Sequence, residues 1–120
     1  MKFGIFVFAT DQSMDFVDLA RAAEERGFES IWAPEHVHIP VERETPYPLS
    51  EDGSLPEMYT RIHDPFIVLA AAASATSTIR LGTGICLVSE HEPVTLAKTI
   101  ASLDHVSNGR FDFEIGRAHV

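Results

Sequence analysis

Cysteine is almost absent from this 120-residue chain, which contains only Cys86. A single cysteine cannot form an intrachain disulfide, so the sequence excludes a disulfide-bonded scaffold and a Cys-rich zinc site. Basic residues are also few, because nine Lys and Arg stand against eighteen Asp and Glu and give a net charge of −9. This charge repels phosphate backbones and anionic lipids, so binding to nucleic acid or to a membrane surface is disfavoured.

Long hydrophobic runs are missing as well. The longest apolar stretch, residues 65–73, is far shorter than the roughly 20 residues that cross a bilayer. The first residues contain one lysine and a short apolar run without a small-residue cleavage pattern, which argues against a signal peptide. We therefore expect a cytoplasmic protein, and its hydrophobic fraction of 45% is typical of a folded domain.

Short β-branched and aromatic runs alternate along the chain with segments of helical periodicity. The predicted strands start near Phe3, Glu29, Ile79 and Phe111. Helices are predicted between them, and a strand–helix–strand crossover makes the two strands parallel and the connection right-handed. The sequence therefore predicts an α/β fold of about three βα units and a fourth strand.

Two architectures contain such units, an open doubly wound sheet and a (β/α)8 TIM barrel. A complete barrel typically needs about 250 residues, so this chain would form the N-terminal half of one. The first predicted strand is followed by Ala9-Thr10-Asp11-Gln12 instead of the Gly-x-Gly-x-x-Gly motif of dinucleotide-binding sheets. The absence of that motif favours the half-barrel.

Several polar residues near the helix ends suggest structural roles. Ser13 is expected to cap the first helix, whose carboxylates are expected to form a solvated face. Asp104 and Arg110 lie on either side of the end of the third predicted helix and are expected to contact each other. Cys86 is expected to be a small buried hydrophobe rather than a nucleophile.

A proline-rich segment without helical or strand periodicity covers residues 35–63. A loop of this length inside a compact domain is usually an active-site element or disordered, and its position directly after a strand favours an active-site element. It begins with Glu35, His36 and His38, whose carboxylate and imidazole groups suit proton transfer near neutral pH. A His-x-His pair could equally bind a metal ion. A structural interpretation has Glu35 and His36 only hydrogen-bonding the mouth of the fold.

A second feature is the run Gly82-Thr83-Gly84-Ile85 in the third predicted strand. Glycine inside a strand pattern marks a bulge or a close approach of the backbone to a ligand. A flat ring system could lie against such a bulge. The other interpretation is a bulge that only bends the sheet.

A series of segments resembles, in order, the N-terminal portion of the bacterial luciferase-like monooxygenase superfamily. The resemblance is greatest to its branch of oxidoreductases that use the deazaflavin coenzyme F420. The matching segments are residues 3–6, 22–32, 34–40, 64–66, 79–85 and 103–110. Each is a weak match alone, and their order over nearly the whole chain makes the resemblance specific.

The resemblance implies a (β/α)8 barrel that holds coenzyme F420, or alternatively FMN, in its mouth and acts on a small organic substrate. Glu35 and His36 would be the catalytic residues. The cofactor contacts would come from His36, Thr83, Gly84 and Ile85. The Gly84–Ile85 peptide bond would be cis, as the corresponding bond often is in this family. No metal ion is expected, and the full-length form is expected to be a homo-oligomer.

The C-terminal end departs from the family pattern, in which a Gly-rich turn follows the fourth strand. Residues 114–120 resemble the translation of a short-read sequencing adapter, GAG ATC GGA AGA GCA CAC GTC. We therefore predict a native partial barrel domain over residues 1–113 and a non-native tail over residues 114–120, with no function for Arg117 or His119. A half-barrel exposes strand edges and apolar faces, so the chain alone is expected to be inactive and poorly folded.

Two other functions are compatible with the residues. One is a metal-dependent barrel hydrolase that uses His36 and His38. The other is a non-catalytic half-barrel that pairs with a second chain as a binding or structural module.

Overall fold

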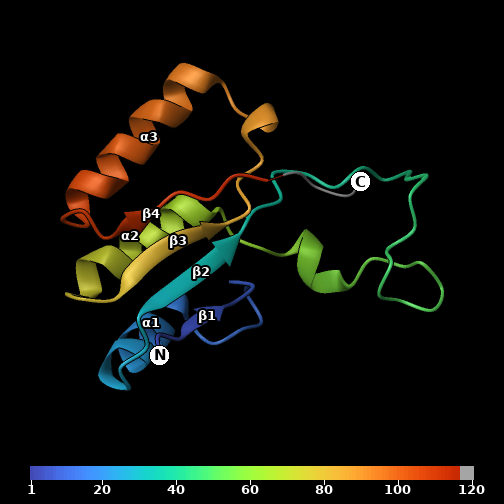
Figure 1. The fold of residues 1–120 in the computed structure, drawn as a ribbon. Coiled ribbons are helices and arrows are strands. Elements are labelled where there is room, and N and C mark those ends of the chain that lie inside the picture. The colour runs from blue at the N-terminus through green and yellow to red at the C-terminus, as the bar shows by residue number, and fades with distance from the viewer. Residues whose placement is uncertain (117–120) are drawn as a thin grey trace.

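The computed structural model describes residues 1–116, in which four parallel strands form one sheet in the order β1-β2-β3-β4 (Figure 1). The strands are β1 (Gly4–Phe6), β2 (Ser30–Pro34), β3 (Arg80–Gly84) and β4 (Phe111–Asp112). Ile5, Ile31, Leu81 and Phe111 form one row across the sheet. Because each strand lies beside its predecessor, the sheet has no reversal of strand order, which a doubly wound fold requires. The predicted α/β arrangement of a half-barrel is confirmed.

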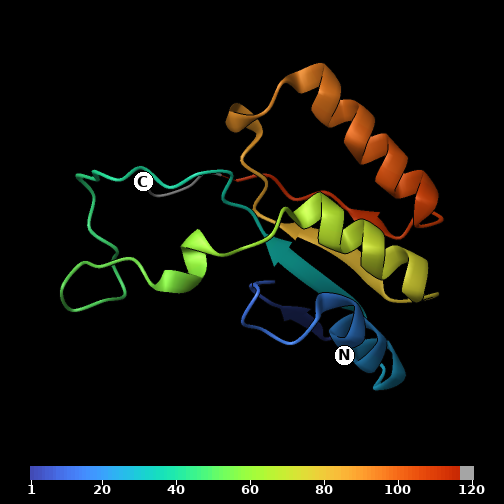
Figure 2. The same ribbon diagram turned by 180° about the vertical axis from the view of Figure 1, so that it is seen from behind.

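Three helices in the described residues cover one face of this sheet (Figures 1 and 2). They are α1 (Phe16–Glu25), α2 (Pro65–Ala75) and α3 (Pro93–Val106). The core lies between helices and sheet, where Ile31, Leu69 and Leu81 are fully buried. No helix in residues 1–116 is long and apolar enough to cross a membrane.

The helices begin at capping carboxylates. Asp64 and Glu92 cap α2 and α3, and a proline follows each of them. The predicted cap of α1 was wrong by two residues: Asp15 accepts two N–H groups of the first turn at 2.9 and 3.0 Å. Ser13 instead donates to the carbonyl of Thr10 at 3.0 Å, which closes the turn before the helix.

Arg110 is nearly buried beside the end of α2 and contacts backbone rather than the predicted Asp104. Its guanidinium donates to the Thr76 hydroxyl and to the carbonyls of Ala73, Thr76, Ile79 and Ser107, at 2.8–3.2 Å. Because the last carbonyls of a helix lack partners within it, a buried cation at this position satisfies them.

Glu24, on α1, also departs from the predicted solvated face. Its carboxylate accepts the backbone N–H groups of Ser77, Thr78 and Ile79 at 2.6–3.1 Å. Burial works against the charged form, but these hydrogen bonds outweigh it and lower the pKa of Glu24 to about 2. Glu24 therefore holds the turn that leads from α2 into β3.

The face of the sheet away from the helices carries aromatic rings over glycines. A Cβ at Gly82 would lie 2.2 Å from the Trp32 ring, and one at Gly84 would lie 2.2 Å from the Phe6 ring. The two glycines therefore leave room for the Trp32 ring of β2 and the Phe6 ring of β1 close to the backbone of β3. Phe6 remains 52% exposed, so this face is apolar and open.

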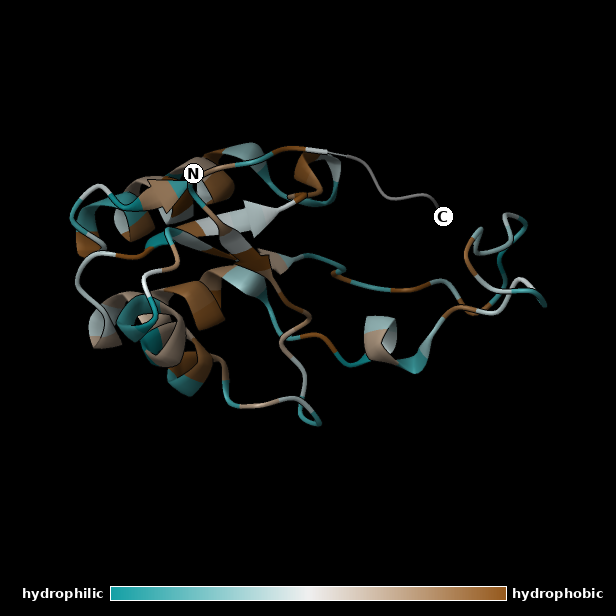
Figure 3. Ribbon diagram, turned by 60° about the horizontal axis from the view of Figure 1, so that its bottom comes forward, coloured by the Kyte–Doolittle hydropathy of each residue, from teal (hydrophilic) through white to brown (hydrophobic). Residues whose placement is uncertain are grey.

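Beyond β2 the chain leaves the sheet and returns at α2, which confirms the predicted loop over residues 35–63 (Figure 3). Its only regular element is a short 3-10 helix, η1 (Glu57–Thr60). After β4, residues 114–116 continue beside the chain that follows β3, with the Cys86 N–H donating to the Glu114 carbonyl at 2.9 Å. Arg117 and His119 lie outside the described residues.

Candidate cofactor pocket at the strand ends

A cavity of about 360 Å³ opens at the carboxyl ends of β1, β2 and β3. Its wall at the sheet is formed by Phe6, Phe8, Pro34, Glu35, His36, Gly84, Ile85 and Leu87. Its wall at the loop is formed by Ile39, Tyr47, Pro48, Leu49, Leu55 and Tyr59. Ligands of parallel α/β folds bind at this end of the strands, and the volume and mainly apolar lining are typical of small-molecule sites.

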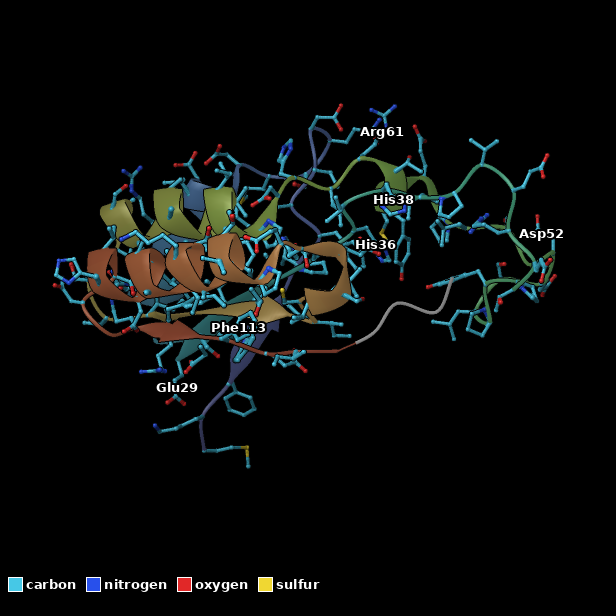
Figure 4. All side chains as sticks on the ribbon, turned by 90° about the horizontal axis from the view of Figure 1, so that it is seen from above. Glu29, His36, His38, Asp52, Arg61 and Phe113 are labelled. Carbon is cyan, nitrogen blue, oxygen red and sulfur yellow. The ribbon has the colours of Figure 1, made fainter. Side chains whose placement is uncertain are left out.

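His36 lies in the pocket wall directly after β2, at the base of the loop whose far end carries Asp52 (Figure 4). Its ring is half-buried and meets the ring of Tyr59 edge-on, with centroids 5.2 Å apart. Burial lowers the pKa of His36, although the charges of Glu90 and Glu35 act in the opposite direction. The imidazole is therefore neutral near pH 7 and can accept a proton.

Glu35 precedes His36 and is 3% exposed. One carboxylate oxygen accepts the Leu87 N–H at 2.7 Å, and the other lies 2.8 Å from His91 Nε2. Both oxygens are therefore engaged in holding the segment that joins β3 to α3. Glu35 and His36 both line the pocket, as predicted, but the Glu35 carboxylate bonds to Leu87 and His91 and not to His36.

The predicted cofactor-binding residues of β3 separate into two groups. Gly84 and Ile85 line the pocket, whereas Thr83 does not. The Thr83 side chain is fully buried, and its hydroxyl bonds to the backbone of Glu114 at 2.9 and 3.0 Å. Because side chains alternate along a strand, Thr83 points away from the side on which Gly84 lies.

The expected cis bond between Gly84 and Ile85 was wrong, because no cis peptide occurs in the described residues. The unusual backbone lies at Ile85 itself, which has a φ of 74°. Positive φ is costly for a β-branched residue, so surrounding contacts must hold it there. One of them is the hydrogen bond from the Ile85 N–H to the Glu114 carboxylate at 3.0 Å.

The geometry gives little support to a metal site at His36 and His38. His38 is exposed, and its Nδ1 lies 3.7 Å from a carboxylate oxygen of Glu90. Within residues 1–116, the only group of three side chains close enough to share an ion is Glu35, Cys86 and His91. Burial, followed by the charge of Glu35, raises the pKa of Cys86 to about 12, so its thiol stays protonated and is a poor ligand.

Sequence reasoning missed several residues of this site. Tyr47 and Tyr59 stand in the aperiodic loop, where no pattern indicates which side chains turn inward. His91 was left unassigned because its partner Glu35 is 56 residues away. Glu90 was also missed. Its Oε2 atom is buried and, alone among the buried side-chain oxygens and nitrogens of residues 1–116, has no hydrogen-bond partner, which only the structure shows.

The fold and the pocket together define a half-barrel of the (β/α)8 class with a small-molecule site at its strand ends. The chain belongs to the luciferase-like monooxygenase family, whose model matches residues 1–119. The predicted family resemblance is thereby confirmed.

Individual relatives agree with this assignment. The chain is 45% identical over 117 residues to uncharacterized protein Rv0953c of Mycobacterium tuberculosis, which corresponds to 97% of this chain and 42% of the relative. It is 32% identical over 110 residues to the F420-dependent hydroxymycolic acid dehydrogenase of the same organism, or 91% of this chain and 26% of that one. The crystal structure of monooxygenase RslO1 from Streptomyces bottropensis matches with a TM-score of 0.77 and 33% identity, over 100% of this chain and 34% of its own.

The chain therefore spans less than half the length of the curated relatives it matches. Relatives differ in cofactor, since a flavin-dependent trigonelline monooxygenase component of Acinetobacter baylyi is 29% identical over 126 residues, or 98% of this chain and 30% of that protein. At the level of the family, the chemistry is F420- or flavin-dependent redox.

Proposed function

We propose that this chain forms the N-terminal half of the active site of an oxidoreductase that uses coenzyme F420, with His36 as the proton-transferring residue. The observation that carries the proposal is the half-buried His36 in the wall of an apolar pocket, beside Gly84 and Ile85. The 32% identity to an F420-dependent dehydrogenase supports the choice of F420.

The residues at the pocket suit a flat heteroaromatic ring. Phe6, Gly84 and Ile85 form an apolar part of the wall, and Glu35 and His36 are the ionisable residues that line the same cavity. Apolar walls with few polar groups are typical of sites for aromatic cofactors. The deazaflavin supplies the hydride chemistry when it is bound, and the protein supplies orientation and proton handling.

His36 would move the proton that accompanies the hydride. When a substrate alcohol is oxidised to a carbonyl compound, its carbon loses a hydride and its hydroxyl loses a proton to a ring nitrogen of His36. In the reverse direction, protonated His36 returns that proton to the carbonyl oxygen as the carbon gains a hydride. The lowered pKa of His36 favours the forward role, because the neutral ring is the acceptor.

Glu35 was also predicted to be catalytic. We propose that it acts on His36 through its negative charge, from a position that its hydrogen bonds fix. Both of its oxygens are bound, one to the Leu87 N–H and one to His91. Its negative charge raises the pKa of His36 and so stabilises the imidazolium that forms during proton transfer.

The loop wall of the pocket indicates the chemistry of the substrate. Among the described residues, neither lysine nor arginine lines the cavity, and the loop contributes Ile39, Leu49 and Leu55. With a net charge of −9 on the chain, an anionic substrate would find no compensating cation on this side. We infer an uncharged, mainly apolar organic substrate with a hydroxyl or carbonyl group.

FMN is the second candidate cofactor, because a relative that covers 98% of this chain is flavin-dependent. The two cofactors can be distinguished by titrating the purified chain with F420 and with FMN in separate experiments and following fluorescence anisotropy. Saturable binding of F420 at a lower concentration than FMN supports the proposal. Tighter binding of FMN replaces the cofactor, and binding of neither overturns the proposal for this chain.

Turnover in the same samples tests His36. With propan-2-ol as the probe alcohol, His36→Ala is expected to bind F420 less tightly, because His36 lines the pocket, and to reduce saturating F420 about 100-fold or more slowly. Binding without turnover in the parent chain would fit the prediction that the chain alone is inactive. Homo-oligomerisation of the complete protein stays a prediction, for which sedimentation velocity is the direct measurement.

A further inference from the structure

Tyr59 is the centre of a cluster of aromatic rings that comes from three separate parts of the chain. Its ring meets Phe8 with centroids 5.0 Å apart, His36 at 5.2 Å and Tyr47 at 5.5 Å. All three contacts are edge-to-face, with interplanar angles of 64–69°. Phe8 follows β1, His36 follows β2 and Tyr47 lies in the long loop, so Tyr59 joins the loop to the ends of two strands.

We propose that Tyr59 is a positioning residue that fixes the orientation of the His36 imidazole toward the pocket. This proposal rests on the proposed role of His36 in proton transfer. It also gives the long loop a function in the reaction, because the loop delivers the ring against which His36 packs.

The His36 ring needs such a contact because, within residues 1–116, no hydrogen bond holds it. Neither Glu35 nor Glu90 bonds to it: Glu35 is bound to Leu87 and His91, and Glu90 lies nearest to His38. Proton transfer depends strongly on the position of the acceptor nitrogen, and a displacement of about 1 Å is costly. Aromatic packing against Tyr59 is therefore the contact that sets the rotamer of His36.

Tyr59 is itself held from several sides. Its backbone N–H donates to the Pro56 carbonyl at 3.1 Å within η1, and its hydroxyl lies 3.2 Å from the hydroxyl of Tyr47. Burial, together with the hydrogen bond and the proximity of Tyr47, raises the pKa of Tyr59 to about 12. The phenol therefore keeps its proton at neutral pH and serves as a rigid neutral wall.

The test compares Tyr59→Leu with Tyr59→Phe and uses Tyr47→Phe as a matched control. An aromatic ring shifts the resonances of nearby protons, upfield over its face and downfield at its edge, so the Cε1 and Cδ2 protons of His36 report the contact in a two-dimensional ¹H–¹³C spectrum. Tyr59→Phe and Tyr47→Phe keep the rings and are expected to leave these shifts close to those of the parent chain. Tyr59→Leu removes the ring and is expected to change them.

An unchanged His36 spectrum in a folded Tyr59→Leu variant would overturn the proposal. If that variant does not fold, Phe8→Leu replaces it, since it removes the ring that supports Tyr59 from the other side and is expected to shift the same resonances. Absence of a shift in a folded Phe8→Leu variant counts against the proposal equally.

Kinetics separate positioning from a purely structural role. With F420 bound and propan-2-ol as substrate, Tyr59→Leu is expected to lower kcat about 10-fold and to change KM less than twofold. Recovery of kcat in Tyr59→Phe is expected, and an unchanged kcat in Tyr59→Leu would contradict the proposal. The NMR spectrum is recorded without cofactor, so it tests the contact between Tyr59 and His36 independently of F420. If Tyr59→Leu changes the His36 resonances but the chain does not bind F420, the proposed function is wrong and the positioning of His36 by Tyr59 stands.

Discussion

The two ends of the same sheet are built on opposite principles. At the end where the strands begin, charged side chains are paired: Glu24 accepts three backbone N–H groups, Arg110 donates to four carbonyls, and Arg80 forms a two-pronged ion pair with Asp112. At the end where the strands finish, Ile85 has a positive φ, and Glu90 has a buried oxygen that accepts no hydrogen bond within residues 1–116. Interactions that stabilise the fold are concentrated at the end where the strands begin, and groups suited to binding and chemistry lie at the end where the strands finish.

This division follows from the topology. The turns at the strand starts are short and connect each helix directly to the next strand, so polar side chains there can bond to nearby backbone. The loop of residues 35–63 leaves the strand ends and returns only at α2, so the same end is free to form a cavity of about 360 Å³. In barrels of this class, residues at the strand starts serve stability and residues at the strand ends serve function.

Removing Arg110 is expected to have the largest effect on stability. Arg110→Met leaves several buried carbonyls without a donor, each of which costs about 1–3 kcal/mol when unsatisfied. We expect a loss of about 3 kcal/mol or more in the free energy of unfolding, measured by urea denaturation. Arg26→Met is the control, since exposed Arg26 donates only to the Ala22 carbonyl, and a comparable loss in both variants would contradict the comparison.

Glu35 tests the opposite end of the sheet. Glu35→Ala removes the acceptor of the Leu87 N–H and the partner of His91, and we expect a loss of about 2–3 kcal/mol together with weaker F420 binding. Glu35→Gln can accept from Leu87 through its amide oxygen, so it should recover most of the stability. If Glu35→Gln is as unstable as Glu35→Ala, charge rather than hydrogen bonding holds the segment after β3.

Glu24 gives a smaller, pH-dependent effect. Its pKa in the folded chain is about 2, below the ordinary value of 4.5, so its contribution is complete above pH 4.5 and is lost as the pH falls toward 2. Glu24→Gln should cost about 1 kcal/mol at neutral pH and flatten the acid side of the stability profile. Urea midpoints between pH 6 and pH 2.5 measure this, with exposed Glu25→Gln as the control that should keep the parent slope.

Local patterns predicted the half-barrel because its determinants are local. Prolines after Asp64 and Glu92 mark two helix starts, and Gly27, with a φ of 78°, marks the end of α1. The apolar periodicity of each segment then requires parallel pairing of successive strands. Two of the predictions that failed concern partners distant in sequence: Glu24 bonds 55 residues away at Ile79, and Arg110 bonds 37 residues away at Ala73.

The site was predictable in part for the same reason. His36 and Glu35 follow a strand directly, so the position of the strand end places them at the pocket. Tyr59 occupies a loop in which no period exists, and its neighbours are set by packing alone. The face of the sheet on which Thr83 lies could not be predicted from the sequence, because it depends on the register of β3. A shift of one residue exchanges the two faces.

The smallest effect concerns Glu90, whose buried Oε2 atom accepts no hydrogen bond within residues 1–116 and lies 3.7 Å from His38 Nδ1. Burial lowers the pKa of His36 most, and the charge of Glu90 raises it, so Glu90→Gln should lower it further without unfolding the chain. The Cε1 proton of His36, followed by NMR from pH 4 to pH 8, measures this pKa directly. Glu51→Gln, in the loop of residues 35–63, removes an equal charge from an exposed position and should leave the pKa of His36 in place. Equal shifts in both variants would mean that His36 responds to the net charge of −9 on the whole chain. A shift in Glu90→Gln alone would show that the Glu90 carboxylate acts on His36 through its local charge, whereas the charged side chains at the strand starts act through hydrogen bonds to backbone.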